Sequence, residues 1–174
     1  VLPIQKFIQA HIISSNSEII LWAGAEEVIK YLAVILVLYR TGYIYEPIDW
    51  PIYLITAALG FAALENALFL IKPLSLGQDT VTLLTGQLRF LGSTLLHTVA
   101  TGILGISLAI SMHRRSVARK LYLISGLALA TALHSLFNFF IIKNSGSDFL
   151  QVFGFLWVVA IIVMLLFEKV RRLE

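Results

Sequence analysis

Long apolar stretches alternate with short polar ones along most of this chain. Each of the five long stretches exceeds the roughly 20 residues that a helix needs to cross a bilayer. We therefore predict membrane-spanning helices over Glu18–Arg40, Trp50–Ile71, Thr82–Met112, Leu121–Lys143 and Phe149–Val170. The shorter stretch Leu2–Ile13 predicts a short helix that lies in the membrane interface or ends a truncated span. The expected fold is an all-α, polytopic transmembrane helical bundle.

Composition points to the same class of protein. Hydrophobic residues make up 59% of the 174 positions and charged residues 13%, whereas soluble domains contain about 45–50% apolar and about 25% charged residues. The sequence shows no internal repeat, so we expect one integral-membrane domain over residues 1–174, with a core that carries the motifs at 18–143. The absence of cysteine excludes disulfides and thiolate chemistry.

Lysine and arginine gather on one side of the membrane if the five helices alternate in direction. These residues are Arg40, Arg114, Arg115, Arg119, Lys120, Lys169, Arg171 and Arg172. The positive-inside rule makes that side cytoplasmic, so we expect the C-terminus and the loop Arg114–Lys120 in the cytoplasm and the N-terminus outside the cell membrane. This orientation accounts for the net charge of +3, and we expect no nucleic-acid partner.

Ionisable residues interrupt the first predicted span, which contains Glu26, Glu27 and Lys30. Each charge at mid-membrane costs about 2.5–3.5 kcal/mol on insertion scales, so residues of this kind are candidates for function. Lys30 lies one turn after both carboxylates and can neutralise one of them within the helix. Because neighbouring side chains on a helix point about 100° apart, we predict that Glu26 and Glu27 have different roles.

The next three spans carry polar residues at a similar depth. They are Glu65 and Asn66, then His97 and Thr101, then His134 and Asn138. Residues four apart share a helix face, so both histidine-containing pairs can point inward together. At about 1.5 Å of rise per residue, the polar groups of the four spans lie about 9–14 Å below the outer surface. This alignment predicts one site, with Arg89 as a supporting residue near the outer interface.

Four motifs occur in order inside these apolar segments: Glu26-Glu27-x-x-Lys30, Phe61-x-x-x-Glu65-Asn66, Arg89 followed by His97-x-x-x-Thr101, and His134-x-x-Phe137-Asn138. Together they resemble the PrsW-type intramembrane proteases, within the wider superfamily of CAAX-processing and bacteriocin-immunity membrane proteases. The resemblance covers Glu26 to about Phe140. The CAAX branch usually has histidine where Glu65 stands, so the chain looks more like the PrsW branch. The resemblance implies a hydrolase of peptide bonds in membrane-embedded or juxtamembrane substrates, in which a first-motif glutamate activates water.

The residues themselves offer this chemistry. A carboxylate can act as a general base toward water, and His134 and Asn138 can donate hydrogen bonds to a tetrahedral oxyanion. Glu65 and His97 would position the water. The candidate catalytic residues are therefore Glu26, Glu27, Glu65, His97, His134 and Asn138, with Lys30, Asn66, Arg89 and Thr101 in support.

Three alternatives stay open. Glu26, Glu65, His97 and His134 are ligands of the kind that zinc accepts, so the hydrolysis is either metal-free or zinc-dependent. The same fold is implied for a scaffold subunit of the gamma-secretase complex, so a non-catalytic scaffold is a second alternative. A proton-coupled transporter is a third, which the absence of an inverted repeat or a broken helix disfavours.

Overall fold

The structure is a computed structural model that describes residues 2–11, 15–77, 79–143 and 149–172. All regular secondary structure in these ranges is helical. The elements are α1 (Leu2–His11), α2 (Ser15–Thr41), α3 (Asp49–Ser75), α4 (Asp79–Ser111), α5 (Ser116–Lys143) and α6 (Phe149–Arg171). The predicted all-α bundle is confirmed, and each predicted span corresponds to one of the helices from α2 to α6.

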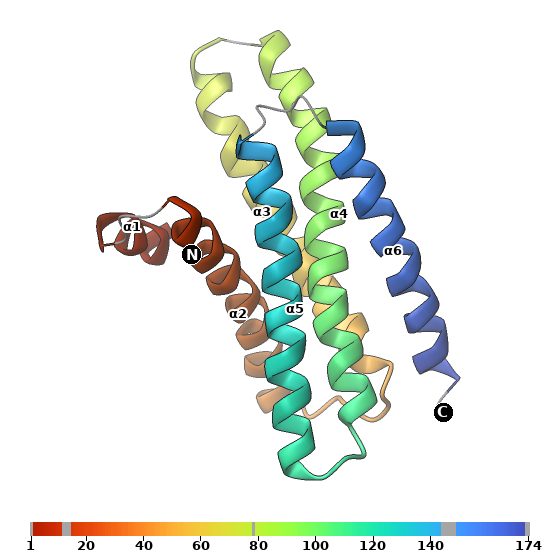
Figure 1. Ribbon diagram of the computed structural model, residues 1–174. Coiled ribbons are helices and arrows are strands. Elements are labelled where there is room, and N and C mark those ends of the chain that lie inside the picture. Colours follow the sequence, from red (N-terminus) through yellow and green to blue (C-terminus); the bar gives the residue numbers. More distant parts are fainter. Residues whose placement is uncertain (1, 12–14, 78, 144–148, 173–174) are drawn as a thin grey trace.

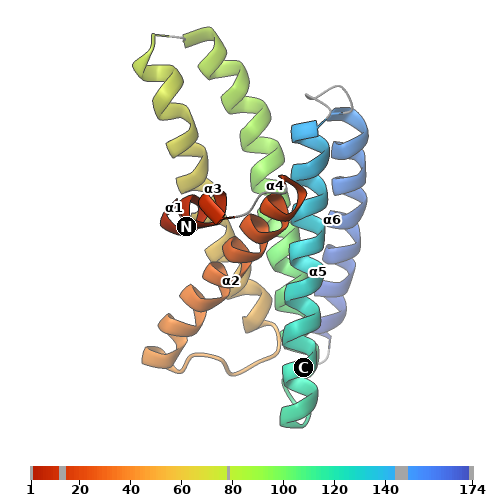
Figure 2. The ribbon, with the colours of Figure 1, turned by 60° about the vertical axis from the view of Figure 1, so that its left-hand side comes forward.

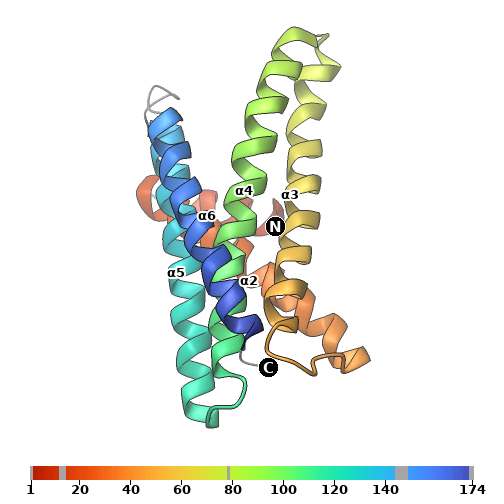
Figure 3. The ribbon, with the colours of Figure 1, turned by 90° about the vertical axis from the view of Figure 1, so that its right-hand side faces the viewer.

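Helices α3 to α6 run alternately up and down beside one another (Figure 1). The hairpin of α3 and α4 rises well above the start of α2, which slants across the bundle (Figures 1 and 3). Helix α1 lies across the beginning of α2, at about the mid-height of the bundle (Figure 2). The end of α2, the turn between α4 and α5 and the C-terminal end of α6 all lie toward the lower end of Figure 1.

Within the described residues, four helices are long and apolar enough to cross a membrane. The candidate spans are Asp49–Ile71, Phe90–Ser111, Ser116–Phe140 and Leu150–Arg171. Helix α2 is also long, at 27 residues, but it does not reach the same apolarity because Glu26, Glu27 and Lys30 lie in its middle. A chain with this many apolar helices is a multi-pass membrane protein.

Helix α4 lies at the centre of the bundle. It packs against α3, α5 and α6, and 67% of its span is buried, compared with 22–28% of the other three spans. Glycine permits the closest approach, because a Cβ atom on Gly105 would stand 2.5 Å from the Cα atom of Pro51 on α3. Tight packing at small residues is a common way for membrane helices to associate.

The bundle is apolar outside and polar inside. Leu36, Leu64 and Met164 expose more than half of their surface, as expected of side chains that face lipid. By contrast, Glu27, Lys30, His97, Thr101 and His134 are almost completely buried. Buried ionisable groups at this depth need partners within the protein, because no water is available in the hydrocarbon layer.

Candidate active site

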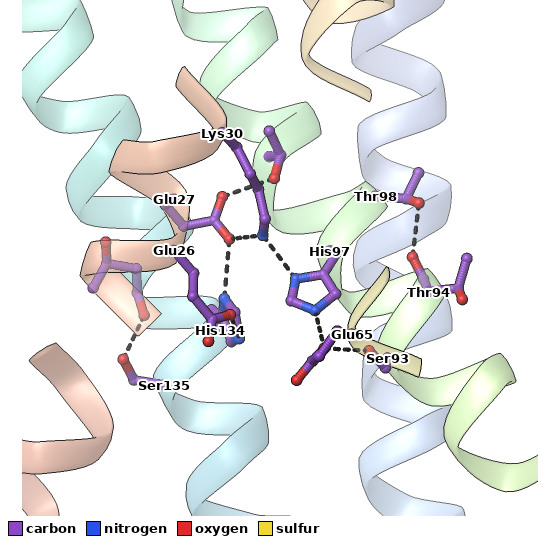
Figure 4. Close-up of polar contacts among 12 residues, drawn as sticks. Glu26, Glu27, Lys30, Glu65, Ser93, Thr94, His97, Thr98, His134 and Ser135 are labelled. Carbon is purple, nitrogen blue, oxygen red and sulfur yellow. Dashed lines mark hydrogen bonds and ion pairs between the residues drawn. The ribbon is translucent and has the colours of Figure 1, made fainter. Parts of the chain in front are cut away.

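Four helices bring polar side chains, most of them buried, into one cluster (Figure 4). The contributing residues are Glu26, Glu27 and Lys30 on α2, Glu65 on α3, His97 and Thr101 on α4, and His134 on α5. Short hydrogen bonds link the four helices at this level, which lies between the two ends of every span. Most of the residues that the sequence placed in one layer therefore lie in this cluster, whereas Asn66 and Asn138 do not take part in the hydrogen bonds named here.

Glu27 is the most heavily bonded member of the cluster. Its Oε1 atom accepts from Lys30 Nζ at 2.6 Å and from His134 Nδ1 at 2.9 Å, and its Oε2 atom accepts from Thr101 Oγ1 at 2.7 Å. These donors come from α2, α4 and α5, so one carboxylate holds three helices together (Figure 4). Both oxygens are occupied, which suits a positioning role.

Lys30 connects this carboxylate to a histidine and a second carboxylate. Its Nζ atom lies 2.7 Å from His97 Nδ1, and His97 Nε2 lies 2.8 Å from Glu65 Oε2. An ammonium group has donors only, so Nδ1 accepts and the ring donates its Nε2 proton to Glu65. Ser93 Oγ donates to the same Glu65 oxygen at 3.1 Å. The ammonium also lies 4.7 Å from the centroid of the Phe61 ring, within the range of a cation–π contact.

Glu26 differs from Glu27 in having a free oxygen. Its Oε1 atom accepts from Gln5 Nε2 at 3.0 Å, whereas its Oε2 atom is buried and has no hydrogen-bond partner among the described residues. The Nε2 atom of His134 lies 3.6 Å from that oxygen. Because His134 donates its Nδ1 proton to Glu27, the Nε2 atom of a neutral ring carries a lone pair. Two acceptors thus face each other, and a proton or a cation between them would satisfy both.

Glu26, His97 and His134 form a group suited to a metal ion. One oxygen or nitrogen ligand atom from each lies within 4.8 Å of the others, and all three residues are buried. A carboxylate and two imidazoles make up a ligand set found in catalytic zinc sites. Glu27 bonds the far nitrogen of His134, and such a carboxylate behind a metal-binding histidine fixes the ring and its tautomer.

The charge of the cluster agrees with this donor set. Around His134, Glu26 and Glu27 against Lys30 leave a formal charge of −1 when the histidine is neutral. A charge inside a membrane is costly, so a cation or a proton beside Glu26 is favourable. A metal ion binds the deprotonated form of a carboxylate or histidine, so it replaces the proton on the ligand atom. At His97 an ion would therefore compete with the hydrogen bonds to Lys30 and Glu65.

Comparison with protein families agrees with this geometry. Residues 4–167 match the model of the PrsW family intramembrane metalloproteases. The chain belongs to this family. Neither a curated protein nor a solved structure matches it. The PrsW match begins within α1 and ends within α6, so it extends beyond Glu26–Phe140 at both ends and includes the short N-terminal helix. Membership confirms the resemblance seen in the four motifs and indicates a membrane peptidase.

Among the predicted residues of this PrsW-family chain, Glu65, Asn66 and Asn138 lie outside the candidate metal-binding group. Glu65 contacts this group through His97. Asn66 is buried, with Nδ2 donating to Thr94 Oγ1 at 3.3 Å and Oδ1 lacking a partner. Asn138 lies one turn after His134 on α5 and is half-buried, outside the hydrogen-bonded cluster described above. The side chain of Arg89 lies outside the described part of the structure.

Two residues of the site were not anticipated from the sequence. Ser93 lies one turn before His97 on α4 and bonds Glu65, and the four-residue spacing that links His97 with Thr101 would also have indicated it. Gln5 comes from α1 and bonds Glu26, 21 positions further along the chain. No spacing rule connects residues in two different helices, so the sequence carried no signal for that contact.

Proposed function

We propose that this protein is an intramembrane endopeptidase in which Glu26 activates the attacking water. The observation that carries the proposal is the free oxygen of Glu26, buried without a hydrogen-bond partner among polar side chains from four helices. A buried acceptor of this kind is costly to leave unsatisfied, so a water molecule at this position is favourable. Membership in the PrsW family supports a peptidase over the scaffold and transporter alternatives.

In the metal-free form of the proposed reaction, Glu26 acts as a general base. The carboxylate takes a proton from water while the water oxygen attacks the carbonyl carbon of the scissile peptide bond. The carbon–nitrogen bond then breaks, and Glu26 returns the proton to the departing amine. One product ends in a carboxyl group that carries the water oxygen, and the other ends in an amino group.

The remaining residues hold the base and the carbonyl oxygen in position. Glu27 keeps His134 and Lys30 in place through the hydrogen bonds described above. His134 directs its lone pair toward Glu26, which favours a ligand role over donation to the oxyanion. The developing oxyanion therefore needs another donor, and we assign that part to the amide of Asn138, one turn further along α5.

A metal ion fits this site, and we propose zinc because its hydrolytic centres use the same ligand types. Glu26, His97 and His134 would hold it. Such an ion, when bound, supplies Lewis-acid polarisation of a carbonyl group and makes a nearby water more acidic. Glu26 would act as a ligand while the ion is bound, and it acts as the general base in the metal-free reaction.

The depth of the site suggests the substrate. Glu65 lies six residues before Ile71, where the α3 span ends, which is about 9 Å by helix rise. A membrane-embedded or juxtamembrane segment can reach this depth if its helix opens beside a polar cavity, because backbone groups in hydrocarbon must stay bonded. Basic residues at the opposite end of the bundle support a cytoplasmic C-terminus and a site in the outer half of the membrane.

The experiment is single-turnover cleavage of a membrane-embedded peptide by purified protein in one detergent. Glu26→Gln keeps the shape of the side chain but removes its basicity, so we expect cleavage to be lost while the protein still folds. Glu46→Gln is the matched control, because Glu46 is an exposed carboxylate in the connection between α2 and α3. Cleavage by Glu26→Gln at the rate of the unmodified protein would overturn the proposal.

A further inference from the structure

Helix α1 reaches the site from outside the four-helix cluster. It packs on α2, and Gln5 and Ile8, three residues apart on one face, are half-buried. Ile4 and Phe7 are exposed, at 45% and 65%. A helix of ten residues cannot cross a bilayer, and apolar side chains on its open faces suit a helix that lies in the interface. From this position Gln5 bonds Glu26 Oε1 at 3.0 Å.

Glu26 depends on this contact for its orientation. Within the described residues, Gln5 is the side chain that donates a hydrogen bond to Glu26, since the donors on α2, α4 and α5 bond Glu27. One held oxygen limits rotation of the carboxylate, and the other oxygen then stays directed toward His134. A catalytic group needs this kind of support, because small misplacements reduce rates strongly.

We infer that α1 is a working part of the active site and that Gln5 is a positioning residue for Glu26. The inference rests on the proposed role of Glu26. A neutral amide suits this position because it can donate a hydrogen bond without adding charge. An ammonium group there would form an ion pair and weaken the carboxylate as a base, whereas a second carboxylate would repel it.

The test compares Gln5→Ala and Gln5→Leu with Gln9→Ala. Gln9 lies one turn further along α1, is exposed and has no bond to Glu26, so it is the matched control. Leucine keeps most of the volume of glutamine but cannot donate a hydrogen bond. We expect kcat to fall about 10–100-fold in both Gln5 variants, the usual effect of losing a supporting hydrogen bond in an active site. KM should be unchanged, and Gln9→Ala should cleave normally.

Removal of residues 1–11 provides a second measurement. Among the described helices, α1 has substantial contacts with α2 alone. We therefore expect the shortened protein to fold, with an unchanged melting temperature for its core. Its kcat should fall as far as that of Gln5→Leu, since both lack the same donor.

Several results would overturn the inference. Wild-type kcat in both Gln5 variants would show that Glu26 works without α1. Faster cleavage by the Gln5 variants would show that α1 blocks access to the site. An equal fall in kcat in Gln9→Ala would show that the loss comes from weaker packing of α1 on α2. In each of these cases the proposed function stands as long as Glu26→Gln is inactive. An active Glu26→Gln variant would remove the proposed function together with the inference.

Discussion

His134 Nε2 and Glu26 Oε2 face each other at 3.6 Å without a hydrogen bond between them. The other nitrogen of His134 donates to Glu27, so both facing atoms are acceptors when the ring is neutral. Such a pair needs a donor or a cation between its two atoms, which a water molecule, a proton or a metal ion can provide. The nature of that partner decides between the metal-free and the metal-dependent reaction.

The first prediction concerns this partner. We expect purified protein to retain a stoichiometric divalent metal, and cleavage to stop after treatment with a chelator and to return on addition of zinc. His134→Ala should lose the metal, because it removes one of three ligands. His113→Ala is the control, since His113 is exposed in the turn between α4 and α5. Elemental analysis gives the metal content, and cleavage that persists in chelator without metal would establish the metal-free reaction.

The second prediction concerns the stability that Glu27 provides. Glu27→Gln removes the charge that compensates the buried ammonium of Lys30, at 2.6 Å. Loss of one partner of a buried ion pair costs about 3–5 kcal/mol, because the other charge is left uncompensated. We expect the free energy of unfolding in detergent to fall by that order. Glu46→Gln, at an exposed position, should have no effect.

Combining Glu27→Gln with Lys30→Met separates the ion pair from the other contacts of Glu27. The double variant has no buried ammonium and should be more stable than the sum of the two single effects predicts. Residues in one network usually show coupling of about 0.5–3 kcal/mol. Strictly additive effects would mean that the 2.6 Å contact between the two residues contributes nothing to stability.

Much of the fold and of the site could be predicted because helix geometry is regular. Spans of known length with a fixed rise put Glu26, Glu65, His97 and His134 at one depth. In the structure, ligand atoms of Glu26, His97 and His134 lie within 4.8 Å of one another, and Glu65 bonds His97. The unequal environments of Glu26 and Glu27 also follow from their 100° separation. Which of the two keeps a free oxygen depends on the rotation of α2 against α5, and that rotation is set by packing between helices.

Other features required the three-dimensional structure. The contact of Gln5 with Glu26 depends on how α1 docks onto α2. His97 was a candidate partner for water, yet both of its ring nitrogens already contact protein groups, Lys30 and Glu65. The sequence shows which donors and acceptors are present. It does not show which donor bonds which acceptor, because the packing around long side chains selects their rotamers.

The third prediction concerns the contact between α3 and α4, which carry Glu65 and His97. Gly105→Ala would place a Cβ atom 2.5 Å from the Cα atom of Pro51. Backbone cannot yield as a flexible side chain does, so the helices must separate, at a cost of about 1–3 kcal/mol. Gly60→Ala is the control, because nothing lies within 4 Å of its added Cβ atom. Equal melting temperatures for the two variants would contradict this account.

The last prediction tests the oxyanion donor. Asn138 lies one turn after His134, on the helix that carries a metal-binding candidate, and its half-buried amide is outside the hydrogen-bonded cluster. If it donates to the oxyanion, the bond strengthens only in the transition state, so its loss affects turnover more than binding. Removal of one such donor typically slows turnover by about 10²–10³. We therefore expect Asn138→Ala to lower the single-turnover rate by this order while substrate affinity is kept. Asn138→Asp is the informative companion, because it preserves the size of the side chain but replaces the donor with a carboxylate that repels the oxyanion. Wild-type rates in Asn138→Ala would assign the residue to helix packing and leave the oxyanion donor to be sought elsewhere in the site.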